Sequence, residues 1–126
     1  MNLKSISTNK APGAVGPYSQ GIKANTLIFT SGQLPIVPET GELLKGDIQK
    51  ETMQCLENVK AILEAEGATL ENVAKVNIYI KNMDDFPLIN EAYEKYFNKH
   101  KPSRSCVEVS KLPKDGDIEI EAIAVL

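Results

Sequence analysis

The chain has 126 residues, of which 42% are hydrophobic and 25% are charged, and its formal net charge is −3. This length predicts one domain, residues 1–126, with a core of its own. The acidic balance argues against nucleic acid as a partner, because phosphate binding depends on clustered Lys and Arg. No run of 18 apolar residues and no leader-like N-terminus is present, which predicts a cytoplasmic protein without a membrane span.

The residues that most often bind metals are sparse. Cys55 and Cys106 lack metal-ligand spacing, and the single histidine, His100, cannot complete a site with them. We therefore expect no metal, no cofactor and two free thiols.

The first third of the chain predicts a loop and a hairpin. Residues 11–21 are punctuated by Pro and Gly, as loops are. Residues 22–24 and 26–33 are predicted to pair as a hairpin with Asn25 at the turn. Residues 27–31 are apolar on both faces, which indicates a strand covered on both sides.

A helix is predicted over residues 47–66, with Asp47 as its N-cap and Gly67 just past its end. Its apolar side chains recur at helical spacing and form one stripe: Thr52, Cys55, Leu56, Val59, Ile62 and Leu63. Cys55 is interpreted as a small core residue and not as a nucleophile.

The rest of the chain predicts a strand, a second helix and two more strands. Residues 73–81 alternate between apolar and polar, and Asp84 or Asp85 is expected to start a helix that stops before Pro102. Residues 103–109 and 118–126 are the last two strands. The eight residues between these strands allow either a hairpin or a crossing.

This order predicts an α+β fold in which two helices cover one face of a single mixed sheet. The apolar side chains Leu27, Phe29, Ile123 and Val125 imply that the other face is also buried. We therefore expect a homo-oligomer packed through the open sheet face, and an interior position for the C-terminal strand.

The last two strands carry the most distinctive chemistry. Alternation places Arg104, Cys106 and Glu108 on one face of the first, and Glu119 and Glu121 together on one face of the second. A guanidinium beside a thiol and near carboxylates suits recognition of a small carboxylate, since Arg matches a carboxylate with two donors. A cross-strand salt bridge on a solvated sheet face remains an equally open reading.

Other segments carry weaker signals. Ser31-Gly32-Gln33 closes a strand with a glycine that lets a ligand approach the backbone, and Tyr18 lies in a loop typical of binding loops. A turn glycine and an ordinary loop are the alternatives. No glycine-rich phosphate motif and no Ser-His-Asp arrangement is present.

Together these residues carry a resemblance. Ala11-Pro12, GPYSQG at 16–21, FTSGQ at 29–33 and RSCVEV…LPKDG…IEIEAIA at 104–124 resemble the RidA (reactive intermediate deaminase) family, also called YjgF. The resemblance implies a chorismate-mutase-like fold and a homotrimer with clefts between subunits. It also implies hydrolysis of 2-imino acids, such as 2-iminobutanoate and 2-iminopropanoate, to 2-keto acids and ammonia.

The resemblance further implies roles for single residues. Arg104 would hold the substrate carboxylate, and Glu119 would position or activate the water. The remaining contacts would come from the main chain at Ser31, Gly32 and Cys106, from Tyr18 closing the pocket and from Asn90 lining it. A covalent role for Cys106, whose thiolate would gain from Arg104, is the lesser reading because no base is in sight.

Two other functions stay open. The same pocket would serve a non-enzymatic regulator that binds a small carboxylate metabolite. An endoribonuclease or translation inhibitor is the third reading, and the chain's acidity and lack of a basic, aromatic-rich patch count against it.

Overall fold

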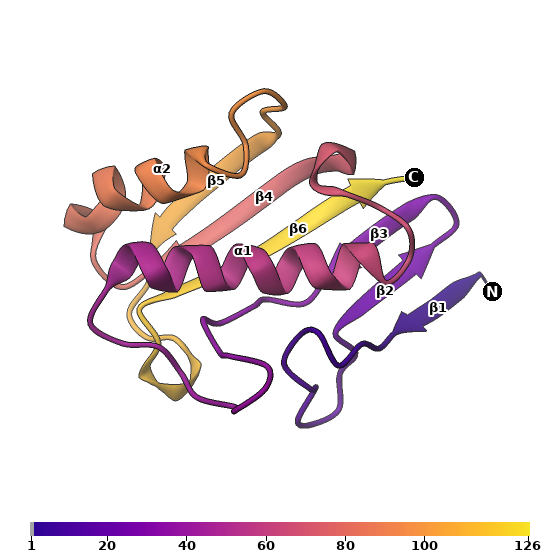
Figure 1. Cartoon of the computed structure of the whole chain (residues 1–126), viewed down its shortest axis with the longest axis horizontal. Helices are drawn as coiled ribbons and strands as arrows, with labels where there is room; N and C mark the ends of the chain where they lie inside the picture. The colour runs from indigo at the N-terminus through magenta and orange to yellow at the C-terminus, as the bar shows by residue number, and fades with distance from the viewer. Residues whose placement is uncertain (1) are drawn as a thin grey trace.

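Six strands form one mixed sheet in the computed structural model, which describes residues 2–126 (Figure 1). In spatial order they run β1-β2-β3-β6-β4-β5. Only β4 and β5 are parallel, and every other neighbouring pair is antiparallel. The strands are β1 (Leu3–Ile6), β2 (Gly21–Ala24), β3 (Leu27–Thr30), β4 (Val73–Ile80), β5 (Ser103–Glu108) and β6 (Ile118–Val125).

The sequence analysis missed β1. This strand has four residues at the edge of the sheet, and Ile6 is its only buried side chain. A segment so short and so exposed shows no alternation to detect. The β2–β3 hairpin was predicted correctly, and Asn25 at its turn adopts a left-handed backbone with φ of 57°.

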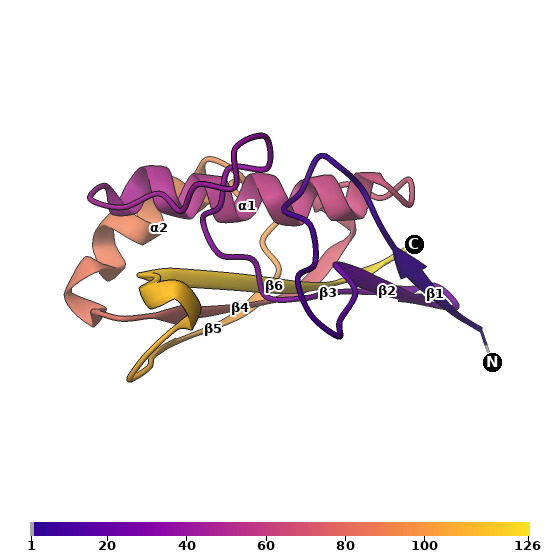
Figure 2. The same cartoon turned by 90° about the horizontal axis from the view of Figure 1, so that it is seen from below.

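Two helices, α1 (Ile48–Glu64) and α2 (Phe86–Glu94), cover one face of this sheet and leave the other bare, as the edge-on view shows (Figure 2). The predicted fold class is therefore confirmed, with one strand more than expected. No helix among residues 2–126 is long and apolar enough to cross a membrane.

The start of α1 follows its sequence signals. The side chain of Asp47 accepts hydrogen bonds from the backbone N–H groups of Gln49 and Lys50, as an N-cap does. The predicted apolar stripe is buried against the sheet, and Cys55 lies within it as a core residue. The helix ends at Glu64, slightly earlier than expected.

The second helix is shorter than the sequence suggested. Asp85 occupies its N-cap position without a capping hydrogen bond from its side chain, and Pro87 lies in the first turn. Ile89, Tyr93 and Phe97 point into the core. The chain then continues through turns to β5.

The two final strands do not form a hairpin. Strand β5 joins the sheet at its edge beside β4, whereas β6 lies between β3 and β4. The interior position of the C-terminal strand is confirmed. Ile118 and Ile120 face the helices, so Glu119 and Glu121 face the open side of the sheet.

The open face of the sheet is partly apolar. Leu27, Phe29 and Val125 are each about 40% exposed on it, at 37%, 39% and 42%. In one chain this surface is uncovered, so β3 is buried on one face only.

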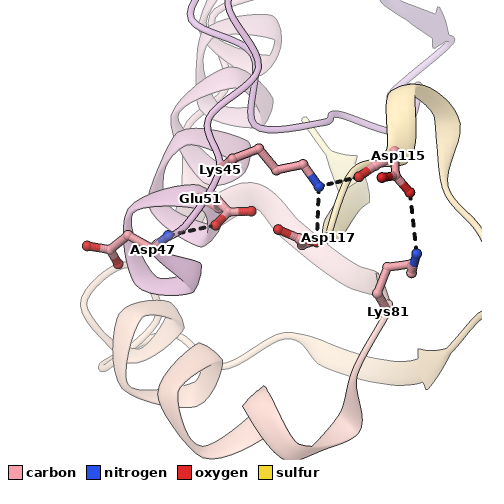
Figure 3. A network of polar contacts seen from close by, with 6 residues as sticks. All are labelled: Lys45, Asp47, Glu51, Lys81, Asp115 and Asp117. Atoms are coloured by element: carbon pink, nitrogen blue, oxygen red, sulfur yellow. Dashed lines mark hydrogen bonds and ion pairs between the residues drawn. The ribbon is translucent and has the colours of Figure 1, made fainter.

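A polar network joins the start of α1 to the start of β6 (Figure 3). Glu51 accepts a hydrogen bond from the backbone N–H of Asp47 at 3.0 Å, and its other carboxylate oxygen points toward Asp117 (Figure 3). Lys45 pairs with Asp117 at 3.2 Å, and Lys81 pairs with Asp115 at 3.4 Å. Asp117 directly precedes β6, so this network helps to fix the strand that carries Glu119.

Candidate functional site

The first half of the candidate site lies where α2 packs on the edge strand β5. Arg104 is the strand neighbour of Val76 and therefore faces the helices. Its Nη1 donates a 2.8 Å hydrogen bond to Oδ1 of Asn90 on α2. The centre of the guanidinium lies 5.2 Å from the ring centroid of Phe86 and 4.8 Å from that of Tyr93, both within cation–π distance.

Arg104 lines a cleft of about 590 Å³, here called the arginine cleft, which it shares with Asn90, Tyr93, Glu94, Phe97, Lys101 and Pro102. The ion pairs within residues 2–126 join Lys4 to Glu66, Lys45 to Asp117 and Lys81 to Asp115, and none involves Arg104. The predicted alternative of a cross-strand salt bridge is therefore wrong. A guanidinium held by an amide and two rings keeps several donors available for an anion.

The hydroxyl of Tyr93 is buried and has no hydrogen-bond partner within residues 2–126. Burial raises the pKa of Tyr93 to about 12, although the charge of Arg104 opposes this shift. The phenol therefore stays neutral beside the cation and serves Arg104 through its ring.

Cys106 lies on the same face of β5 as Arg104, as the alternation predicted, and packs against the core. Burial raises the pKa of its thiol, and the nearby charge of Arg104 lowers it by less. The net direction is opposite to that of an activated cysteine, which argues against a covalent role.

The second half of the candidate site lies around Glu119 on β6. A pocket of about 450 Å³, here called the glutamate pocket, is lined by Tyr18, Ser31, Gly32, Lys114 and Glu119 among others. A side chain on Gly32 would place its Cβ 2.7 Å from the Glu119 carboxyl carbon. A larger residue here would push the Glu119 carboxyl aside, which gives a physical reason for a glycine whose role the sequence left open.

The side chain of Gln20 anchors the loop that carries Tyr18. This buried side chain accepts from the backbone N–H of Thr8 at 2.7 Å and donates to the carbonyls of Thr8, Ala11 and Pro12. Sequence reasoning missed Gln20, because nothing in a sequence marks a glutamine as buried.

Ser31 joins the same loop to β3. Its hydroxyl donates to the carbonyl of Ser19 at 2.6 Å, and its backbone N–H donates to the carbonyl of Gln20. Tyr18 itself is 53% exposed and stands at the rim of the pocket. The loop is thus anchored at its base and presents an accessible aromatic ring.

Glu119 is half-buried on the open sheet face. Burial raises the pKa of its carboxyl, and the negative charge of Glu121 raises it further. Glu121 accepts hydrogen bonds from the amide of Asn77 at 3.2 Å and the hydroxyl of Tyr79 at 3.4 Å. A raised pKa makes this carboxylate a stronger base than an ordinary glutamate, as a group that transfers protons needs to be.

The two halves do not meet within one chain. Arg104 and Cys106 face the helices, whereas Glu119 and Glu121 face the open side, and β4 separates the two strands. The expectation that the guanidinium lies near these carboxylates is therefore wrong for a single chain. The cause is the crossing between β5 and β6, which the sequence could not distinguish from a hairpin. Within residues 2–126, no group of three or more His, Cys, Asp or Glu side chains is arranged to hold a metal ion.

Comparison with known proteins places this arrangement in a family. A family model described as Endoribonuclease L-PSP matches residues 8–126. A RutC family protein of Pyrococcus horikoshii is 58% identical, with 94% of both chains covered. A 2-iminobutanoate/2-iminopropanoate deaminase of Escherichia coli is 48% identical, with 97% of both chains covered.

The solved structures agree with this assignment. The crystal structure of Escherichia coli TdcF with bound serine superposes with a TM-score of 0.93 at 48% identity, covering 98% of each chain. The match spans both halves of the candidate site, and the chain therefore belongs to the Endoribonuclease L-PSP family, which is the YjgF/RidA family.

Proposed function

We propose that this protein hydrolyses small 2-imino acids, such as 2-iminobutanoate and 2-iminopropanoate, to 2-keto acids and ammonia. The observation that carries the proposal is Arg104, a cation that pairs with no acid among residues 2–126 and is held by Asn90 and two aromatic rings at the wall of a cleft. Such a group is prepared to bind a carboxylate. The relative named for this reaction at 48% identity supports the choice of substrate.

Catalysis requires a second chain in this proposal. Arg104 and Glu119 lie on opposite faces of one sheet, so one substrate reaches both only if the arginine cleft of one chain meets the glutamate pocket of another. A homotrimer packed through the open sheet face would bring such halves together between neighbours. The exposed apolar side chains of that face support this assembly.

The chemistry needs orientation and a group that moves protons. Arg104 fixes the carboxylate, and main-chain groups at Ser31, Gly32 and Cys106 frame the imine. Tyr18 closes the pocket and Asn90 lines the opposite wall. Glu119 takes a proton from water as the oxygen attacks the imine carbon, which is already electrophilic.

The test is a coupled assay. A PLP-dependent threonine dehydratase generates 2-iminobutanoate, and formation of 2-ketobutanoate is followed with and without the protein. We expect acceleration by the wild type and a loss of about 100-fold in Arg104→Ala, because a charged clamp on the carboxylate is removed. Lys101→Ala, which removes a cation from the rim of the same cleft, is the matched control and should stay active.

The outcomes separate the candidate functions. Full activity in Arg104→Ala, with its assembly state unchanged, would contradict the carboxylate clamp. A folded oligomer without any acceleration would instead favour a protein that binds a small carboxylate metabolite and regulates a partner.

The family description also names an endoribonuclease, and this activity is the other candidate. The net charge of −3 counts against it. RNA binding that weakens steeply with added salt, together with cleavage that Arg104→Ala abolishes, would favour the nuclease over the deaminase.

A further inference from the structure

Glu121 is a charged side chain to which the proposed reaction gives no task. It lies two residues beyond Glu119 on the same face of β6, opposite Asn77 of β4. Its Oε2 accepts hydrogen bonds from Nδ2 of Asn77 at 3.2 Å and from the hydroxyl of Tyr79 at 3.4 Å. Two donors thus hold this carboxylate in place.

The strand geometry brings this fixed charge close to Glu119. Alternate residues of a strand lie about 7 Å apart on one face, so the two carboxyl groups are neighbours. Tyr79 is the strand partner of Glu119 and donates to Glu121, so this residue is a neighbour of both acids. On the other side, the Glu119 carboxyl lies next to Gly32, in the space that a side chain at this position would need.

No cation of this region neutralises the two acids. Lys75, on the same face of β4, donates to the hydroxyl of Ser105 on β5 at 3.5 Å. Lys114 lines the glutamate pocket, and within residues 2–126 neither lysine pairs with Glu119 or Glu121. Two titratable neighbours have a raised pKa and stay uncharged, Tyr79 on β4 and Cys55 on α1 behind the sheet. Tyr18 stands at the rim of the pocket.

The pKa values of this group agree with that arrangement. Burial and the charge of Glu121 both raise the pKa of Glu119, and burial followed by Glu121 raises the pKa of Tyr79. Tyr79 therefore keeps its proton and remains the hydrogen-bond donor to Glu121.

Imine hydrolysis needs one proton to be taken and then returned. As the water oxygen bonds to the carbon of the protonated imine, its proton passes to Glu119 and the electron pair of the C=N double bond moves to nitrogen. The protonated Glu119 then gives this proton to the amine nitrogen. The C–N bond breaks, the C=O bond forms, and the hydroxyl proton leaves with the departing ammonia as ammonium.

We propose that Glu121 is a positioning residue for this transfer: held by Asn77 and Tyr79, its negative charge makes Glu119 retain the proton between the two steps. The inference rests on the proposed function for its chemistry, and on the open face of one chain for its geometry.

The kinetic test uses Glu121→Gln, which keeps the shape of the side chain and both hydrogen bonds but removes the charge. We expect the ascending limb of kcat/KM against pH to move down by about half to one pH unit, as Coulomb's law gives for a charge about 7 Å away. The plateau should fall about threefold, since Glu119 becomes a weaker base. Glu121→Asp keeps the charge and should leave the pH of the ascending limb almost unchanged. Glu64→Gln, at an exposed position on α1, should change neither the limb nor the plateau.

A second measurement needs no turnover. The carboxyl carbon of Glu119 is titrated by 13C NMR in the wild type and in Glu121→Gln, and the midpoint should fall by the same amount as the kinetic limb. An unchanged midpoint overturns the proposal whatever the kinetics show. A lowered midpoint in a protein that does not accelerate imine hydrolysis supports the coupling of the two acids and overturns the proposed function instead.

Discussion

The guanidinium of Arg104 is held in place by uncharged neighbours. Its side chain has no counter-ion within residues 2–126, and its position depends on one hydrogen bond from Nη1 to Asn90 and on the rings of Phe86 and Tyr93. Rings stabilise the cation without competing for its donors. Asn90 is neutral, so it fixes the guanidinium and leaves the charge for a ligand.

We expect Asn90→Ala to raise KM for 2-iminobutanoate about tenfold with little change in kcat, because one hydrogen bond to a charged group is lost. Asn90→Asp should raise KM further, since an acid there competes with the substrate for Arg104. Steady-state kinetics in the coupled assay measure both. Asn98→Ala, at an exposed position past the end of α2, is the control. An unchanged KM in both Asn90 variants would show that Arg104 needs no such support.

At the scale of elements, local signals predicted well what local interactions determine. The Asp47 cap, the stripe of α1 and the turn at Asn25 follow from residues within a few positions of one another. Strand pairing is non-local, and β1 and the crossing between β5 and β6 were therefore missed or left open. The open question of this crossing affected the site, because strand pairing decides which side chains of different strands lie close together.

The sequence analysis also did not predict which polar side chains are buried. Gln20 and Glu51 are 4% and 1% exposed, yet nothing in the sequence separates them from surface residues. Gln20 holds the Tyr18 loop through four hydrogen bonds, and Glu51 accepts a hydrogen bond from the backbone N–H of Asp47 at the start of α1. Their roles depend on neighbours that only the fold supplies.

Glu51 makes stability depend on pH. Burial, then the neighbouring Asp117, raises its pKa from 4.5 to about 7. The folded chain therefore holds a proton between these two pH values that the unfolded chain has released. Stability from this group is full below about pH 4.5 and is lost as pH rises through 7.

We expect Glu51→Gln, which imitates the protonated acid, to melt several degrees above the wild type at pH 8 and at nearly the same temperature at pH 5. Thermal unfolding followed by circular dichroism at both pH values measures this difference. Glu64→Gln, on the exposed side of the same helix, should shift neither value. A difference between Glu51→Gln and wild type that is equal at both pH values would contradict the proton linkage.

At the scale of the whole molecule, the two halves of the candidate site are separate within one chain. The arginine cleft faces the helices, and the glutamate pocket opens at the other side of the sheet. The open face of the sheet mixes apolar side chains with the polar group around Glu121. Activity should therefore depend on assembly even if every chain is correctly folded.

Mixing two inactive variants tests this dependence. Arg104→Ala and Glu119→Gln chains, unfolded together and refolded in equal amounts, should recover about a quarter of wild-type activity, because random pairing joins an intact cleft to an intact pocket in that share of contacts. Each variant refolded alone should stay inactive. No recovery in a mixture of the same oligomeric mass would show that one chain supplies both halves.

The central place of β6 also has a consequence for biosynthesis. Residues 118–125 leave the ribosome after every other strand, yet β3 and β4 can join one sheet only through them. Until they emerge, the nascent chain exposes two unpaired strand edges and the apolar underside of α1. The sheet is therefore completed only by its last strand, and the edges of β3 and β4 that face β6 stay unpaired until that strand is made.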